Sequence, residues 1–154
     1  IINRFKDGEK RCIRCIGFNV QHDPETEAPI DLSKPLLKQR SKWRRAIMFD
    51  KPLISSRPVN WHIGYHWIEG NTEQPADKHL ILVHLHKLDY EMCKKKHTEQ
   101  AKRNWSKKDI RGHIGTHNLM AEGPAFNKWF FSGSTFQNKH NDLVNYPEFI
   151  KNVI

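Results

Sequence analysis

The sequence has few cysteines and no long hydrophobic run. Its three cysteines, Cys12, Cys15 and Cys93, are too few for a disulfide framework in 154 residues. This scarcity indicates a reducing compartment, and we expect a cytoplasmic protein. A membrane-spanning helix needs about 20 consecutive apolar residues, and no such stretch occurs, so a spanning segment is excluded. The first residues also lack the basic-then-apolar pattern of a signal peptide.

Acidic residues are outnumbered. The chain has 26 Lys and Arg against 17 Asp and Glu, a formal net charge of +9. This excess favours an anionic partner such as nucleic acid, a membrane surface or a phosphorylated substrate. Hydrophobic residues make up only 37%, but eight Phe, five Trp and three Tyr supply large surfaces for burial. A disordered chain is therefore disfavoured, and the length suits one domain or part of a larger one.

Two segments carry the pattern of strands. Residues 11–22 alternate apolar and polar side chains, which predicts a strand. Residues 79–86 are dense in leucine, isoleucine and valine, which predicts a central strand with Leu80, Leu82 and Leu85 buried. The acidic, proline-rich segment 23–35 between them predicts a loop.

The C-terminal half contains the strongest helix signal. Residues 88–105 predict a helix with Leu88 and Met92 on one face and charged side chains on the other. Residues 109–154 are rich in small and polar side chains and predict an irregular segment, in which Pro147 opens a terminal helical turn. We therefore expect one domain, with residues 1–105 as its main part and residues 106–154 as an irregular C-terminal extension.

Ten histidines make a metal site a candidate. His84 and His86 lie two apart on a predicted strand and so share a face, where they could bind a metal ion or make buried hydrogen bonds. Cys12 and Cys15 have the spacing of half a zinc site. On a strand, however, these two positions face opposite sides, and no second pair with suitable spacing follows. We expect these two cysteines to be core residues.

Basic residues are concentrated in residues 94–96 and 102–108. Such a patch can neutralise phosphates, but a solvated helix face has the same composition. No zinc-finger, RNP or basic-zipper pattern accompanies it. A basic nucleic-acid-binding module without catalysis is therefore the alternative function, and nucleic acid the less favoured partner.

Four sequence blocks occur in a distinctive order: GFNV, PIDLSKPLLKQR, DKPLISSRPVNWHIGYHW and LILVHLHKLDY. In this order they resemble the C-terminal half of the catalytic domain of family-2-like glycosyltransferases with the GT-A fold. The resemblance extends over residues 17–89. The matching positions are Pro29, Asp31, Pro35, Leu36, Leu37, Gln39, Arg40, Asp50, Lys51, Pro52, Ile54, Pro58, Trp61, Gly64, Tyr65, His66, Leu80, Leu82, His84, Leu85 and Asp89.

The resemblance implies a fold and an activity. The fold would be α/β: a partial GT-A-like, Rossmann-like mixed sheet with flanking helices and an irregular C-terminal tail. The activity would be transfer of a sugar from a nucleotide-diphosphate donor to a hydroxyl of a glycan or other acceptor, with metal-assisted departure of the diphosphate. The family carries an Asp-x-Asp motif upstream of the matching region, and this sequence contains none. We therefore expect the chain to be incomplete, with the N-terminal half of the same domain as its missing partner.

The resemblance also implies a metal ligand. A histidine downstream of the acceptor region completes the shell of the cation in this fold, and His66 at the end of the G-Y-H block matches it. His84 and His86 are the alternates. Imidazole together with carboxylate and diphosphate oxygens suits Mn²⁺, with Mg²⁺ as the alternative.

Other matching residues have implied roles at the substrates. Arg40 and Lys51 could meet phosphate or acceptor hydroxyls, or could instead pair with the acidic loop. Trp61 and Tyr65 could stack on a sugar ring, although Trp61 also suits an apolar core. An inverting mechanism needs a carboxylate to accept the proton of the acceptor hydroxyl, and the candidates are Asp31 and Glu27.

Overall fold

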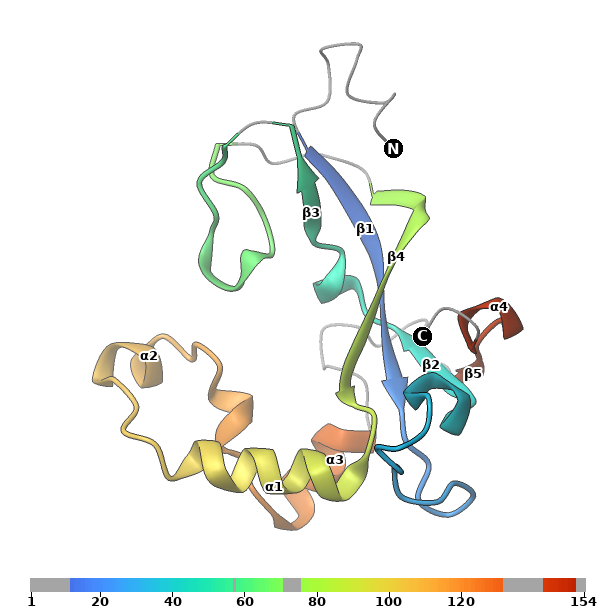
Figure 1. Ribbon diagram of the computed structural model, residues 1–154. Helices are drawn as coiled ribbons and strands as arrows, with labels where there is room; N and C mark the ends of the chain where they lie inside the picture. Colours follow the sequence, from blue (N-terminus) through green and yellow to red (C-terminus); the bar gives the residue numbers. More distant parts are fainter. Residues whose placement is uncertain (1–11, 57, 71–75, 132–142, 152–154) are drawn as a thin grey trace. The chain divides into compact units, whose positions relative to one another are not determined.

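The computed structural model describes residues 12–56, 58–70, 76–131 and 143–151. Within them the chain is a mixed α/β protein with a five-stranded antiparallel sheet and four α-helices (Figure 1). The strands are β1 (Cys12–Gln21), β2 (Lys42–Arg45), β3 (Pro52–Ser55), β4 (Ala76–Lys87) and β5 (Val144–Asn145). The helices are α1 (Tyr90–Ala101), α2 (Lys107–Arg111), α3 (Gly123–Phe131) and α4 (Glu148–Lys151). Short 3₁₀ turns are η2 (Leu36–Gln39), η3 (Ile47–Phe49), η4 (Ile63–Tyr65) and η5 (Thr116–Leu119).

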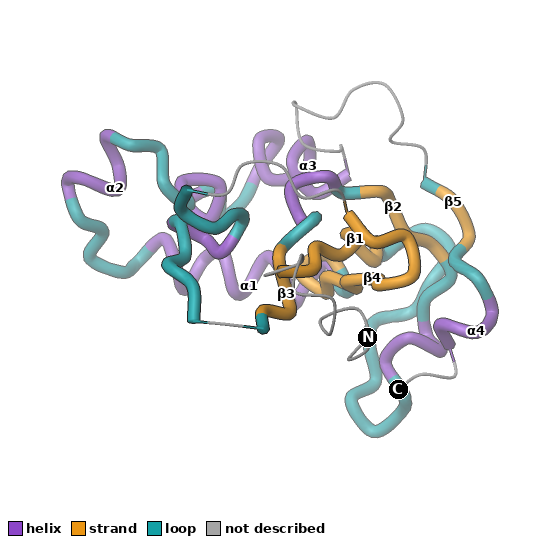
Figure 2. The backbone as a smooth tube through the Cα atoms, turned by 90° about the horizontal axis from the view of Figure 1, so that it is seen from above, coloured by secondary structure: helices purple, strands orange, loops and turns teal. Residues whose placement is uncertain are grey.

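The sheet has the order β3-β1-β2-β5, and β4 also pairs with β1. The strands are drawn in orange in Figure 2. Cys12 lies opposite Ser55 and Ile13 opposite Ile54 in the β1–β3 pair. The expected α/β class is confirmed. The sheet of the described residues is antiparallel, whereas the expected mixed sheet also needs parallel pairs with crossover connections. The GT-A-like character of the fold stays a prediction.

The chain divides into two compact units. The first unit comprises residues 1–19 and 45–84, and the second unit comprises residues 20–44 and 85–154. In the first unit, Cys12, Ile13 and Cys15 of β1 are buried. Gly17 lies against η3: a Cβ at this position would be 2.5 Å from the carbonyl carbon of Phe49. Only glycine lets the backbones approach this closely.

The core of the second unit is aromatic. Cys93 from α1 and Phe126 and Phe130 from α3 are buried together, and Tyr90 and Trp129 pack against them. Helix α1 also packs against η5, and α4 against η2. Phe126 and Phe130 share a face because they are four residues apart on a helix.

Several sequence-based expectations need correction. The described residues of the segment 106–154, which are 106–131 and 143–151, are not an irregular tail: they contain α2, α3, β5 and α4. The signal for α3 was present in the sequence, since Pro124 stands near its first turn and two phenylalanines recur at helical spacing. The helical turn after Pro147 is confirmed as α4. The proposed boundary between residues 105 and 106 stays a prediction.

The predicted strands and the predicted helix are confirmed as β1, β4 and α1. The expected central position of residues 79–86 is not, because β4 pairs with β1 outside the order β3-β1-β2-β5, and the burial of β4 and α1 also differs from expectation. Leu80, Leu82 and Leu85 are half-buried rather than buried, as on a strand whose two faces are not both fully covered. On α1, Met92 is 48% exposed, and the buried face instead carries Cys93 and His97. None of the described helices is long and apolar enough to cross a membrane.

Candidate functional site

Three metal-ligating side chains meet in the second unit: His86, Cys93 and His97. Their ligand atoms all lie within 4.8 Å of one another, and the Nε2 atoms of His86 and His97 are 3.0 Å apart. Such a group could bind a metal ion. We call these three residues the His-Cys-His cluster.

The chain forms this cluster over a short stretch. Strand β4 ends at Lys87, and Asp89 caps α1 by accepting a hydrogen bond of 2.9 Å from the backbone N–H of Met92. Cys93 and His97 are four residues apart on α1 and therefore share a face. The end of β4 and the first two turns of α1 thus supply all three side chains.

A hydrogen bond fixes the protonation of His97. Its Nδ1 lies 3.0 Å from the carbonyl oxygen of Met120. Because a carbonyl can only accept, Nδ1 carries the proton, and Nε2 of a neutral ring keeps its lone pair. Burial lowers the pKa of His97, which favours the neutral ring, and raises the pKa of the Cys93 thiol to about 11. A metal ion would reverse the second effect, because a coordinated thiol is deprotonated.

Aromatic and basic groups surround the cluster. The ring of Trp129 lies 5.3 Å from His86 and 4.6 Å from His97 between centroids, and His117 stacks on it at 6.0 Å. The Nζ of Lys87 donates to the carbonyl oxygens of Trp129 and Phe130 at 2.6 and 2.8 Å. Burial lowers the pKa of Lys87 to about 7.

The first unit has an exposed aromatic loop, which we define as residues 59–69. Trp61 is 36%, Tyr65 64% and Trp67 46% exposed. A β-bridge between Trp61 and Ile68 closes the loop. Gly64 and Tyr65 have φ angles of 75° and 58°, and tyrosine seldom adopts this left-handed conformation. The loop therefore presents three aromatic side chains on a sharply turned backbone.

Lys51 and His66 tie the aromatic loop to its unit. Lys51 Nζ donates to the carbonyl oxygen of Gly64 at 2.9 Å, and His66 Nδ1 lies 2.6 Å from the carbonyl oxygen of Met48. By the same reasoning as for His97, Nδ1 of His66 carries the proton and Nε2 keeps its lone pair. Burial, and then the charge of Lys51, lower the pKa of His66, so the neutral ring is favoured.

The structure brings Lys51, Trp61, Tyr65 and His66 of the predicted site together in the first unit. His84 is also in this unit, where it stacks on Phe49 at 3.8 Å and lies 2.6 Å from the side-chain oxygen of Asn19. His86, two residues further along β4, belongs instead to the His-Cys-His cluster. His84 and His86, the two alternate metal ligands, thus have different partners.

Arg40 is surrounded by protein hydrogen-bond partners. Its side chain is fully buried in the second unit. The guanidinium donates to the carbonyl oxygens of Leu88 and Ala28 at 2.5 and 2.9 Å and to Asp89 at 3.2 Å. It also lies 3.7 Å from Glu27 of the acidic loop. These contacts match the alternative that Arg40 pairs with the acidic loop, and its assignment to the substrate stays a prediction.

The two candidate bases lie in the second unit. The carboxylate of Glu27 accepts hydrogen bonds from Ser41 through Oε1 and from the backbone N–H of Asp23 through Oε2, at 2.8 to 3.1 Å. Asp31 is bound by Ser33 and Lys34, which lower its pKa to about 2. A general base works best with a pKa near the operating pH. The lowered pKa of Asp31 does not favour this residue as the base, and the assignment of Asp31 or Glu27 as the catalytic base stays a prediction.

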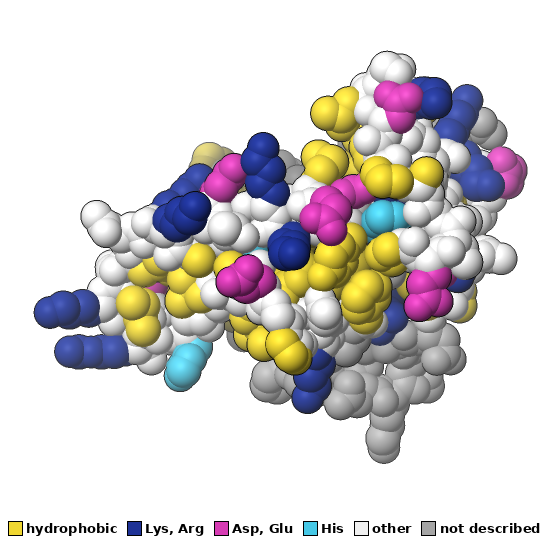
Figure 3. Space-filling model, turned by 90° about the horizontal axis from the view of Figure 1, so that it is seen from below, with side chains coloured by type: hydrophobic (Ala, Val, Ile, Leu, Met, Phe, Trp, Pro, Cys, Tyr) yellow, Lys and Arg dark blue, Asp and Glu magenta, His cyan; other side chains and the backbone are white. Residues whose placement is uncertain are grey.

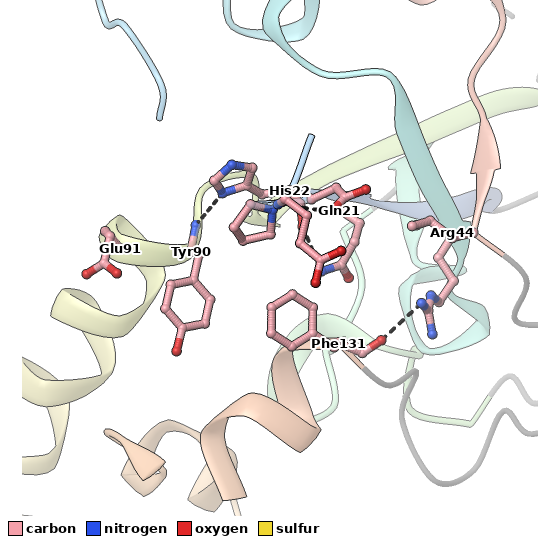
Figure 4. Close-up of a pocket in the computed structure, with 10 residues that line it drawn as sticks. Gln21, His22, Arg44, Tyr90, Glu91 and Phe131 are labelled. Atoms are coloured by element: carbon pink, nitrogen blue, oxygen red, sulfur yellow. Dashed lines mark hydrogen bonds between the residues drawn. The ribbon is translucent and has the colours of Figure 1, made fainter. Parts of the chain in front are cut away.

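The second unit also contains a pocket of about 580 Å³ (Figure 4). Its lining includes His22, Tyr90, Arg44 and Phe131. The backbone N–H of Tyr90 donates to Nδ1 of His22 at 3.0 Å, and Arg44 donates to the carbonyl oxygen of Phe131 at 3.0 Å. Nε2 of His22 lies 3.2 Å from the carbonyl oxygen of Glu27. Both nitrogens of His22 thus have protein partners, and a structural role explains this histidine.

Basic side chains of the described residues do not form one continuous patch on the face shown in Figure 3. On the face shown in Figure 3, Lys and Arg lie among hydrophobic and acidic side chains. A nucleic-acid interface is expected to show a continuous basic patch or stripe. This face does not favour the nucleic-acid alternative.

Comparison with known proteins gave no match to a family model, to a curated protein or to a solved structure.

The sequence-based reasoning missed two members of the His-Cys-His cluster. Cys93 and His97 are separated by three residues, which on a predicted helix places them on one face. That spacing was a usable signal, but both residues fall in a segment dominated by lysine. His86 was anticipated as a metal ligand, although with His84 as its partner.

Proposed function

We propose that this chain is the acceptor-side half of a GT-A-like glycosyltransferase domain. In this proposal it transfers a sugar from a nucleotide-diphosphate donor to an acceptor hydroxyl. The order of the matching blocks over residues 17–89 suggests the activity. The aromatic loop is the observation that supports it most directly, because its three exposed aromatic residues lie within the longest of these blocks.

The aromatic loop has the composition of a sugar-binding surface. Exposed Trp and Tyr combine a large apolar face with a polar tip, which suits a sugar ring with its apolar C–H face and its polar hydroxyls. Trp61 and Tyr65 meet edge to face, with centroids 5.8 Å apart. In the proposal they stack on the acceptor or donor sugar, and Lys51 beside them approaches its oxygen atoms.

His66 fits one ligand position of the Mn²⁺ or Mg²⁺ ion that the proposal requires. Its Nδ1–H is held by a backbone carbonyl, which is the usual arrangement of a metal-binding histidine, and its Nε2 keeps the lone pair. The carboxylate ligands would come from the Asp-x-Asp half of the domain. When bound, the ion would stabilise the negative charge on the departing diphosphate.

The test measures nucleoside diphosphate released from a panel of nucleotide sugars with saturating Mn²⁺. The protein is this chain together with whatever sequence precedes it in its gene. We expect His66→Ala to reduce release by about 10²–10³-fold, the usual cost of losing one group that stabilises transition-state charge. Trp61→Ala should weaken sugar binding about tenfold. His79→Ala and Phe149→Ala, which change exposed residues elsewhere, are the matched controls.

Two results would contradict the proposal. One is the absence of release above background for every nucleotide sugar. The other is full activity of the His66→Ala protein, which would remove His66 from the metal site.

A further inference from the structure

We propose that His86, Cys93 and His97 form a zinc site with three protein ligands and a solvent molecule in the fourth position. This site is independent of the proposed glycosyl transfer. It uses none of the residues assigned to the sugar or to the Mn²⁺ or Mg²⁺ ion.

The spacing of the ligand atoms suits a tetrahedral ion. Two imidazole nitrogens bound to one zinc at about 2.0–2.1 Å lie about 3.3 Å from each other. The Nε2 atoms of His86 and His97 are 3.0 Å apart, and the Cys93 sulfur lies within 4.8 Å of a ring nitrogen of each histidine. Small side-chain movements therefore bring all three atoms to coordination distance.

The hydrogen bonding of His97 also suits a metal. Its Nδ1–H donates to the carbonyl oxygen of Met120, so Nε2 points its lone pair at Nε2 of His86. At this distance either a hydrogen on Nε2 of His86, donated to the lone pair of His97, or a metal ion lies between the two nitrogens. The sulfur of Cys93 lies beside them, and cysteine sulfur together with imidazole nitrogen is a usual ligand set of zinc. The third ligand atom therefore favours a metal ion at this position.

The donor set selects zinc over Mn²⁺ and Mg²⁺. Thiolate and imidazole are soft and borderline ligands, which suit Zn²⁺, whereas Mg²⁺ and Mn²⁺ prefer carboxylates and water. Within the described residues no carboxylate belongs to the cluster. The site would therefore bind Zn²⁺ in preference to the Mn²⁺ or Mg²⁺ ion that the proposed glycosyl transfer requires.

His117 is not assigned as the fourth ligand. Its ring stacks on Trp129, and its centroid lies 6.2 and 6.5 Å from those of His86 and His97. Two imidazoles on one tetrahedral ion have centroids about 5 Å apart, as follows from the zinc–nitrogen bond length. The His86 and His97 rings, at 5.1 Å, meet this value.

The experiment uses cobalt as a spectroscopic substitute for zinc. The chain is purified, stripped with a chelator and titrated with Co²⁺ under reducing conditions. We expect one equivalent to produce visible bands of a tetrahedral ion and a near-ultraviolet thiolate-to-cobalt band. One equivalent of Zn²⁺ should then remove both.

Variants locate the site. Cys93→Ser should remove the thiolate band and weaken zinc binding at least tenfold, and His97→Asn should weaken it similarly. The controls are Cys12→Ser, which changes another buried cysteine, and His84→Ala, which changes a neighbouring histidine of β4. Both variants should keep the thiolate band and the zinc affinity of the wild-type chain. His117→Ala should also retain the bands.

The wild-type titration decides the proposal even if the variants fail to fold. Absence of a thiolate band in the wild-type chain would overturn it. So would a band that persists in Cys93→Ser or that disappears in Cys12→Ser. Loss of the bands in His117→Ala would overturn the three-ligand assignment.

Discussion

Tyr146 is a buried hydroxyl whose ionisation the fold opposes. The residue is 4% exposed, and its hydroxyl donates to the carbonyl oxygens of Leu37 and Arg40. Burial, and then the negative charge of Glu27, raise its pKa from 10.0 to about 12. A phenolate would lose the donated hydrogen bond and face two carbonyl oxygens.

The raised pKa predicts a loss of stability at high pH. The unfolded chain releases the tyrosine proton near pH 10 and the folded chain near pH 12. The contribution of Tyr146 is therefore complete below pH 10 and declines as the pH rises to 12, by about 2–3 kcal/mol. Tyr146→Phe should lose less stability over this range in urea unfolding, whereas the exposed Tyr65→Phe should behave as wild type. Equal slopes for all three proteins would contradict the assignment.

Some residue roles could be read from the sequence and others could not. The alternative that Arg40 pairs with the acidic loop was available, because opposite charges stood in one segment. The need for glycine at position 17 was not, since it depends on the carbonyl carbon of Phe49, which would lie 2.5 Å from a Cβ. A contact between residues 32 positions apart leaves no local pattern.

Helix α1 is held at its N-terminus by one carboxylate with three tasks. Asp89 caps the helix through Met92, accepts from the backbone N–H of Ile30 at 2.9 Å, and receives the buried guanidinium of Arg40 at 3.2 Å. The cap thus connects the helix to the acidic loop and to a buried cation. Its loss should cost more than the loss of an ordinary cap.

We therefore expect Asp89→Ala to lower the free energy of unfolding by about 4 kcal/mol. An ordinary cap is worth about 1 kcal/mol, and a buried cation left without its partner costs about 3–5 kcal/mol. Asp89→Asn keeps an acceptor without the charge and should have an intermediate effect. The control is Ser106→Ala, which removes the cap of the exposed helix α2. Urea unfolding measures all three, and equal losses for the Asp89 and Ser106 variants would refute the argument.

A strand or helix could be predicted where its sequence pattern extended over many residues. Strands β1 and β4 and helix α1 followed from alternation, apolar density and charge. The buried face of α1 did not, because Cys93 and His97 are small or polar residues in a lysine-rich segment. The exposed aromatic loop, with its one β-bridge between Trp61 and Ile68, was not predicted either.

At the scale of the whole molecule, the net charge of +9 and the arrangement of that charge have different consequences. Net charge predicts attraction to any polyanion, whatever its sequence. A specific interface needs basic groups concentrated on one surface, and the face in Figure 3 mixes them with acidic and apolar side chains. Sugar binding through the aromatic loop would depend neither on the net charge nor on a concentration of basic groups.

Salt dependence separates these two modes of binding. We expect the chain to bind a labelled DNA duplex only weakly, with a Kd of about 10⁻⁴–10⁻⁶ M near physiological salt and no preference for sequence. The logarithm of its affinity should fall linearly with the logarithm of salt concentration, because each contacted phosphate releases condensed counterions. Fluorescence anisotropy between about 50 and 200 mM salt measures this slope. Trp61→Ala should leave the duplex affinity unchanged while weakening sugar binding, since stacking on the aromatic loop is not charge-driven. Sequence-specific duplex binding that persists at high salt would instead favour the nucleic-acid alternative over the glycosyltransferase.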